Sequence, residues 1–150
     1  VYIPATDGLA REAEEAGDGV IQGQGKILVM DDEEPIRRLV GMLLANLGYE
    51  VTTAPDGSTA VQIFRDAFDG GHPFDAVLLD LTVPGEMGGL EALGLMRGID
   101  PRVRGIVSSG YSNDPVIAEH ANHGFRGAVV KPFDIEELSR VVREVVTGAG

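Results

Sequence analysis

Three carboxylates, a hydroxyl and an ammonium stand at the ends of short apolar runs, where buried strands are expected to finish. The residues are Asp31, Asp32, Asp80, either Ser108 or Ser109, and Lys131. Ligands of open α/β sheets bind at the carboxyl ends of the parallel strands. We therefore expect these side chains to meet at one edge of a sheet.

The chemistry of this set follows from its charges. Three carboxylates at one edge repel one another unless something positive lies between them. A hard divalent cation with oxygen ligands neutralises such a cluster, and Mg²⁺ is the natural candidate. A cation, an ammonium and a hydroxyl can together bind the oxygens of a phosphoryl group. Because a carboxylate can act as a nucleophile and form an acyl phosphate, the set predicts phosphoryl transfer.

The elements that must position these residues alternate along the chain from Lys26 onwards. Five short segments that are typical of strands alternate with segments whose apolar residues recur at helical spacing. The expected strands span 27–30, 49–53, 76–79, 104–108 and 127–130. This alternation predicts an α/β fold with a parallel sheet, and right-handed crossovers make that sheet doubly wound.

Two of the expected helices have boundaries that the sequence marks only weakly. The third follows a Gly-rich loop and is expected at about 90–97. The fourth has a weak apolar pattern, and we expect it to run from a cap at Asn113 or Asp114 to a stop near Gly124.

Composition narrows the class of protein. The chain has 150 residues, of which 43% are hydrophobic, which suits one domain with a tail. The absence of cysteine excludes a disulfide scaffold and a Cys-ligated metal, and it fits a cytoplasmic protein. A formal net charge of −12 argues against nucleic-acid binding. No run approaches the ~20 apolar residues that span a bilayer, so we expect no direct membrane contact.

Four short motifs in chain order carry a resemblance to a known family. They are Ile-Leu-Val-Met-Asp-Asp-Glu at 27–33, Val-Leu-Leu-Asp-Leu-Thr-Val-Pro at 77–84, Val-Ser-Ser-Gly-Tyr at 107–111 and Val-Val-Lys-Pro-Phe at 129–133. Together they make the chain similar to the receiver domain of two-component signalling, which occurs in response regulators and hybrid histidine kinases. The resemblance implies a flavodoxin-like fold with five helices and five parallel strands in the order 2-1-3-4-5.

The resemblance also implies a role for each acidic residue of the set. Asp80 would accept a phosphoryl group from a phosphohistidine, and the same site would later hydrolyse the acyl phosphate slowly. Asp31, Asp32 and Asp80 would bind Mg²⁺ together with the backbone carbonyl of Thr82. The donor would be a histidine kinase or a His-containing phosphotransfer domain, in cis or in trans.

Two further roles follow from the same resemblance. Ser109, rather than Ser108, would hydrogen-bond the phosphoryl group, because it directly precedes Gly110 as the family's Ser or Thr does. Lys131 would pair with Asp80 or with the phosphoryl group. We expect the domain to be a monomer or a weak dimer.

The chain departs from the family pattern at one position that bears on signalling. An aromatic residue often stands three residues before the lysine, but Ala128 occupies that position here. The family's aromatic switch is therefore missing, and we expect a local response to phosphorylation. The loop at 84–89 is also one residue longer than its commonest form, which should not affect the acceptor chemistry.

The start of the chain predicts its place in a larger protein. Residues 1–25 form an acidic, Gly-rich linker, and residues 26–148 form the receiver domain. Val1–Ala5 is similar to the last strand of a histidine-kinase ATP-binding domain. We therefore expect the chain to be the C-terminal receiver of a hybrid sensor histidine kinase. The kinase region of that larger protein would be the enzyme and can be membrane-anchored. Whether the receiver, which would phosphorylate and dephosphorylate itself, counts as an enzyme stays open.

Two other functions remain as alternatives. A Mg²⁺-dependent phosphohydrolase with an Asp nucleophile usually has a second acid two residues later, where this chain has Thr82. A receiver-like interaction module without phosphorylation would not need the acidic pair and the lysine. Taken singly, Asp31 and Asp32 suit a helix N-terminus, and Lys131-Pro132 suits a turn with a cis bond.

Overall fold

The computed structural model describes residues 22–110 and 114–148. Most of the predicted linker, together with Tyr111 and Asn113, lies outside the described residues. In the described part, Gly23 already contacts the domain, because its N–H donates a hydrogen bond to the carbonyl of Leu47 at 2.9 Å. The first strand then begins at Gly25.

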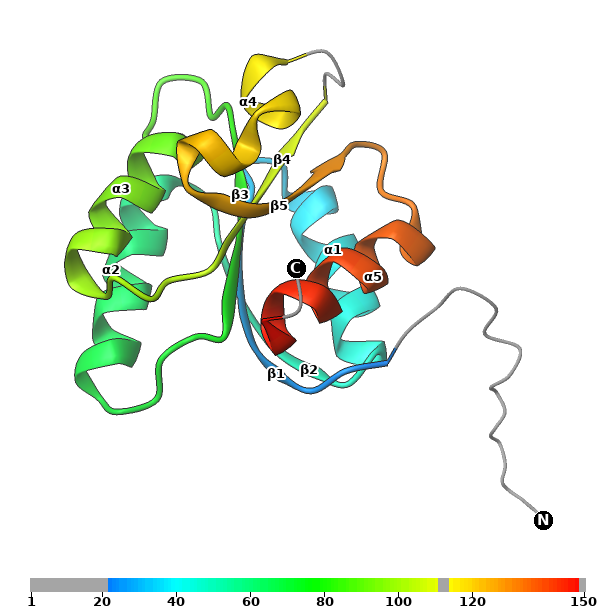
Figure 1. The fold of residues 1–150 in the computed structure, drawn as a ribbon, viewed down its shortest axis with the longest axis horizontal. Coiled ribbons are helices and arrows are strands. Elements are labelled where there is room, and N and C mark those ends of the chain that lie inside the picture. The colour runs from blue at the N-terminus through cyan, green and yellow to red at the C-terminus, as the bar shows by residue number, and fades with distance from the viewer. Residues whose placement is uncertain (1–21, 111–113, 149–150) are drawn as a thin grey trace.

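Five parallel strands form one sheet in the order β2-β1-β3-β4-β5, which confirms the predicted topology (Figure 1). The strands are β1 (Gly25–Met30), β2 (Tyr49–Ala54), β3 (Ala76–Asp80), β4 (Gly105–Ser109) and β5 (Phe125–Val130). Every residue of β3 and β4 is buried, which explains why apolar residues do not alternate with exposed polar ones in these strands.

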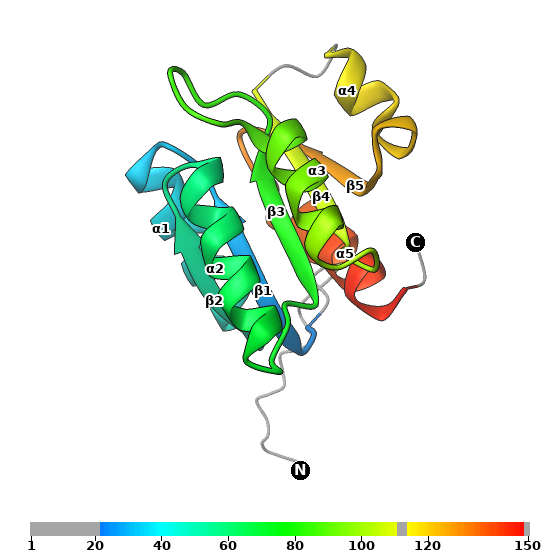
Figure 2. The ribbon, with the colours of Figure 1, turned by 90° about the vertical axis from the view of Figure 1, so that its left-hand side faces the viewer.

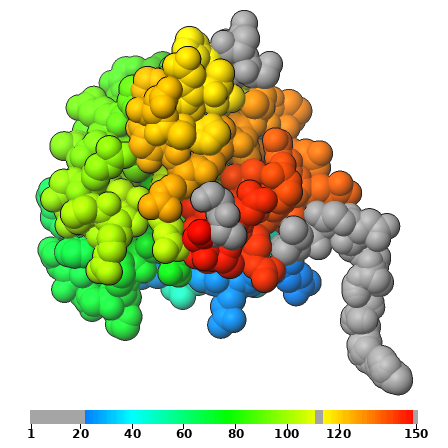
Figure 3. All heavy atoms as spheres, viewed as in Figure 1, coloured from blue at the N-terminus to red at the C-terminus, as the bar shows by residue number. Residues whose placement is uncertain are grey.

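Helices cover both faces of the sheet (Figures 1 and 2). They are α1 (Glu34–Asn46), α2 (Gly57–Asp69), α3 (Gly89–Ile99), α4 (Pro115–Ala118) and α5 (Ile135–Thr147). One apolar core joins α1 and α5 to the sheet, and a second joins α2 and α3 to the opposite face. In the space-filling view, α3, the segment from α4 to β5, and α5 lie side by side on one surface (Figure 3). None of these helices is long and apolar enough to cross a membrane.

The fourth helix is much shorter than the sequence predicts. It covers only Pro115–Ala118 and gives way to a 3-10 helix, η1 (His120–His123), before Gly124. Asp114 does cap it, because the Asp114 carboxylate accepts a hydrogen bond from the N–H of Val116 at 2.9 Å. No residue of α4 or η1 is fully buried. The weak apolar pattern therefore supplies too little packing to extend the helix to Gly124.

The start of α3 lies tightly against the end of β3. A Cβ added to Gly89 would lie 2.7 Å from the backbone oxygen of Asp80. A Cβ added to Gly94, in the exposed middle of the same helix, would meet nothing within 4 Å. Close packing therefore requires glycine at position 89 but not at position 94.

These two glycines make a matched pair of substitutions. Gly89→Ala should lower the free energy of unfolding by about 1–3 kcal/mol, because the methyl group must push α3 away from β3. Gly94→Ala should raise it by roughly 0.5–1 kcal/mol, because alanine favours an exposed helix interior. Urea denaturation of the two variants measures both changes. Equal changes in the free energy of unfolding for Gly89→Ala and Gly94→Ala would contradict the close packing of α3 on β3.

Candidate functional site

The register of the two central strands brings two of the predicted carboxylates together. Met30, the last residue of β1, pairs with Leu79 of β3. The next residues along the chain are Asp31 and Asp80, so their side chains lie at the same height on neighbouring strands. Both are almost fully buried, with exposed fractions of 2% and 4%.

The register of the remaining strands adds the hydroxyl and the ammonium. β4 pairs with β5 so that Ser109 lies opposite Val130, and Lys131 follows directly. Ser108 lies opposite Asp80 in the ladder, whereas Ser109 lines the cavity at the sheet edge. The Lys131-Pro132 peptide bond is cis.

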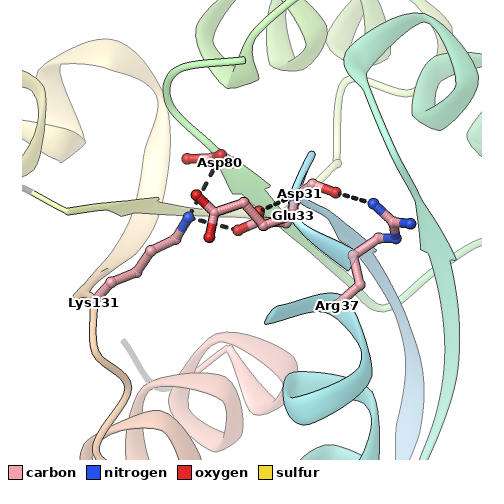
Figure 4. A network of polar contacts seen from close by, with 5 residues as sticks. All are labelled: Asp31, Glu33, Arg37, Asp80 and Lys131. Carbon is pink, nitrogen blue, oxygen red and sulfur yellow. Dashed lines mark hydrogen bonds and ion pairs between the residues drawn. The ribbon is translucent and has the colours of Figure 1, made fainter. Parts of the chain in front are cut away.

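Asp31, Asp80 and Lys131 form one contact network (Figure 4). Carboxylate oxygens of Asp31, Asp32 and Asp80 lie within 4.8 Å of one another. Nζ of Lys131 lies 2.6 Å from Oδ2 of Asp31 and 3.5 Å from Oδ2 of Asp80. The structure therefore brings the predicted acids and the predicted lysine to one place, with the lysine nearer to Asp31 than to Asp80.

The surroundings of Asp80 favour its protonated form. Burial raises the pKa of Asp80 to about 7, and the neighbouring charge of Asp31 and a hydrogen bond with Asp32 act in the same direction. The ammonium of Lys131 and the backbone N–H of Thr82 favour the carboxylate, but they only partly oppose this shift. Ionised Asp80 therefore needs more positive charge than the lysine alone provides.

Lys131 responds in the opposite sense to the same cluster. Burial by itself lowers the pKa of Lys131, but the carboxylates of Asp31 and Asp80 outweigh burial and raise the pKa above its ordinary value. The ammonium therefore stays charged at neutral pH. It provides a fixed positive charge between the two buried carboxylates.

The turn between β1 and α1 holds Asp31 from several sides. Oδ1 of Asp31 accepts a hydrogen bond from the N–H of Glu33 at 2.9 Å. The Asp31 carbonyl accepts one from Nη1 of Arg37 at 2.7 Å, and its N–H donates to the carbonyl of Ala54 at 3.1 Å. The sequence analysis did not single out Arg37. The position of Arg37, on the first turns of the helix that follows the acidic pair, was the available signal.

A cavity of about 330 Å³ opens above the cluster. Its walls include Asp32, Asp80, Thr82, Ser109 and Lys131. Asp32 is exposed to solvent, whereas Ser109 is only 4% exposed. Three carboxylate oxygens within reach of a single point, open to solvent on one side, fit Mg²⁺, which prefers oxygen ligands and keeps several waters.

Comparison with known proteins identifies the family of the chain. Residues 27–143 match the response regulator receiver domain. The chain is 35% identical over 119 residues to sporulation initiation phosphotransferase F of Bacillus subtilis, covering 79% of this chain and 91% of that protein. It is 36% identical over 121 residues to regulatory protein AtoC of Escherichia coli, covering 81% of this chain. The chain therefore belongs to the receiver domain family of two-component response regulators.

Some relatives are much longer than this chain. The chain spans 25% of AtoC and 16% of the CAI-1 autoinducer sensor kinase/phosphatase CqsS of Vibrio cholerae, to which it is 34% identical over 116 residues. Among solved structures, it is similar to the CheX-CheY-BeF3-Mg complex of Borrelia burgdorferi, with a TM-score of 0.72, 25% identity, and coverage of 80% of this chain and 87% of that chain. Receiver domains depend on Mg²⁺ and interact with histidine kinases or phosphotransfer proteins.

The raised pKa of Asp80 predicts how the metal-free protein responds to pH. Unfolded Asp80 loses its proton near pH 4, whereas the folded chain keeps it until about pH 7. Between these values the folded state binds more protons than the unfolded state, so stability falls as pH rises. We expect the free energy of unfolding to drop by ~2–4 kcal/mol over this window because of Asp80.

Urea denaturation in the presence of a chelator, repeated across this pH window, measures the effect. Asp80→Asn carries no titrating group at this position, so the difference between the parent and this variant isolates Asp80. If the difference in free energy of unfolding between the parent and Asp80→Asn does not change with pH, the pKa of Asp80 is not raised in the folded chain.

Proposed function

We propose that Asp80 accepts a phosphoryl group from a phosphohistidine on a histidine kinase or a His-containing phosphotransfer domain. The observation that carries this proposal is the convergence of Asp31, Asp32 and Lys131 around the buried carboxylate of Asp80. The cavity beside it is open to a partner and includes Ser109. The donor acts in cis or in trans.

The proposed transfer is an in-line displacement at phosphorus. A carboxylate oxygen of Asp80 forms the new P–O bond, while the P–N bond to the donor histidine breaks and its electron pair stays on the imidazole. Lys131 donates to one phosphoryl oxygen and the hydroxyl of Ser109 to another. Asp31, Asp32, Asp80 and the carbonyl of Thr82 would hold Mg²⁺, which would supply positive charge to offset the charge of the phosphoryl group. Water later hydrolyses the acyl phosphate slowly and restores the carboxylate.

The larger protein is proposed to be a hybrid sensor histidine kinase with this receiver at its C-terminal end. The acidic, Gly-rich residues 1–25 act as the linker, and residues 26–148 act as the receiver. Likeness to a part of the sensor kinase CqsS supports a sensor kinase as the larger protein. Because phosphohistidine is made from ATP, the receiver would work in the cytoplasm, as a monomer or a weak dimer without nucleic acid.

The acceptor assignment predicts a single modification. With Mg²⁺ and acetyl phosphate, the parent chain should gain the mass of one phosphoryl group, and Asp80→Asn should gain none. The amide is nearly the same size as the carboxyl group but is not a nucleophile, so the fold should persist. Intact-protein mass spectrometry measures the adduct.

An exposed aspartate provides the matched control. Asp69→Asn, at the end of α2, removes the same charge away from the cavity and should leave the adduct unchanged. Undiminished labelling of Asp80→Asn, with circular dichroism confirming its fold, would show that another residue is the acceptor.

The metal assignment predicts that Mg²⁺ stabilises the folded chain. Unfolding separates the carboxylates, so the cation binds only the folded state, and a hundredfold excess over its dissociation constant adds about 2.7 kcal/mol. Asp32→Ala should remove most of this gain, because it deletes one carboxylate ligand. Thermal melting with and without Mg²⁺ measures the change. A parent chain whose melting temperature ignores Mg²⁺ would contradict the assignment.

A further inference from the structure

Arg37 makes a contact with the acidic turn that the proposed mechanism does not use. Its guanidinium reaches back from α1, and Nη1 donates a hydrogen bond to the backbone carbonyl of Asp31 at 2.7 Å (Figure 4). The contact is partly buried. The adjacent Arg38 is exposed instead, and it lies 3.9 Å from Glu34 on the same helix. Two neighbouring arginines therefore have different surroundings.

The carbonyl that Arg37 holds belongs to the peptide unit between Asp31 and Asp32. A peptide unit is planar, so fixing its oxygen also fixes the direction in which the backbone of Asp32 leaves. The side chain of Asp31 has its own contacts, with the N–H of Glu33 and with Lys131. Asp32 is exposed and its side chain has a hydrogen bond with Asp80, so the direction of its backbone and that contact together decide where its carboxylate points.

We infer that Arg37 is a positioning residue for the cation site, and that it acts on Asp32 through the Asp31-Asp32 peptide. The inference rests on the proposed function, because it takes these carboxylates as the ligands of a divalent cation. Loss of a group that orients a metal ligand without touching the metal typically costs roughly 10–100-fold in metal affinity.

Charge and position predict opposite effects for Arg37, which makes the inference testable. As a positive charge beside a cation site, the guanidinium repels the cation, so its removal alone would tighten binding. As the group that fixes the peptide, it keeps Asp32 aimed at the other carboxylates, so its removal weakens binding. The sign of the change in affinity therefore distinguishes the two roles.

The experiment is isothermal titration calorimetry of Mg²⁺ binding at one pH and ionic strength. Three proteins are compared: the parent chain, Arg37→Gln and Arg38→Gln. Arg37→Gln should weaken Mg²⁺ binding about 10-fold. Arg38→Gln removes the same charge without the contact to Asp31, so its affinity should equal or slightly exceed that of the parent. Arg37→Gln that binds Mg²⁺ as tightly as the parent, or more tightly, would overturn the inference.

A merely structural role for Arg37 would be visible in other measurements. Melting without Mg²⁺ reports stability, and a lower melting temperature with unchanged Mg²⁺ affinity also counts against the inference. With acetyl phosphate, Arg37→Gln should need more Mg²⁺ for half-maximal phosphorylation and reach the parent's rate at saturation. A reduced rate at saturating Mg²⁺ would instead place Arg37 in the transfer step.

The route through Asp32 has its own test. In an Asp32→Asn background, Arg37→Gln should cause no further loss of Mg²⁺ affinity, because the group it positions is already altered. A further loss as large as that in the parent would overturn this route. If Arg37→Gln does not fold, Arg37→Lys keeps the charge but has a shorter side chain, and it should bind Mg²⁺ about threefold more weakly; parent-like binding would overturn the inference.

Failure of this inference and failure of the proposed function give different results. A parent chain that binds no Mg²⁺ overturns the metal site, and the role of Arg37 with it. Normal Mg²⁺ binding that Arg37→Gln does not weaken overturns only the role of Arg37. Mg²⁺ binding without any phosphoryl adduct leaves the role of Arg37 standing and overturns the acceptor chemistry.

Discussion

The sharing of one ammonium by two buried carboxylates is the constraint on which the rest of this structure depends. Asp31 and Asp80 are withdrawn from solvent, and Lys131 is the cation that contacts both of them among the described residues. Burial and mutual repulsion make this arrangement costly, as the raised pKa of Asp80 shows. The arrangement persists only because the surrounding fold holds the three groups in place.

The apolar core supplies the free energy that offsets this cost. The central strands are buried on both faces, between α1 and α5 on one side and α2 and α3 on the other. Parallel pairing then forces the carboxyl ends of β1, β3 and β5 to one edge, so the charged groups meet wherever the strands finish. The same packing that stabilises the sheet therefore concentrates the charge.

The two neighbouring aspartates, Asp31 and Asp32, have different environments and therefore suit different roles. Asp31 is buried and uses both carboxylate oxygens on protein groups, Lys131 and the N–H of Glu33. Asp32 is exposed and lines the cavity, and its side chain has a hydrogen bond with Asp80. A receiver that must take up and release a phosphoryl group gains from this division, because one acid anchors the lysine while the other remains open to the solvent side.

The sequence by itself determined the doubly wound sheet and the meeting of Asp31, Asp80 and Lys131, because apolar periodicity and the crossover rule hold without knowledge of distant contacts. The tertiary structure decided what depends on the packing of remote segments. It shortened α4, whose residues find too little core to cover. It placed Lys131 nearer to Asp31 than to Asp80, since the register of distant strands sets these distances and no local pattern encodes them.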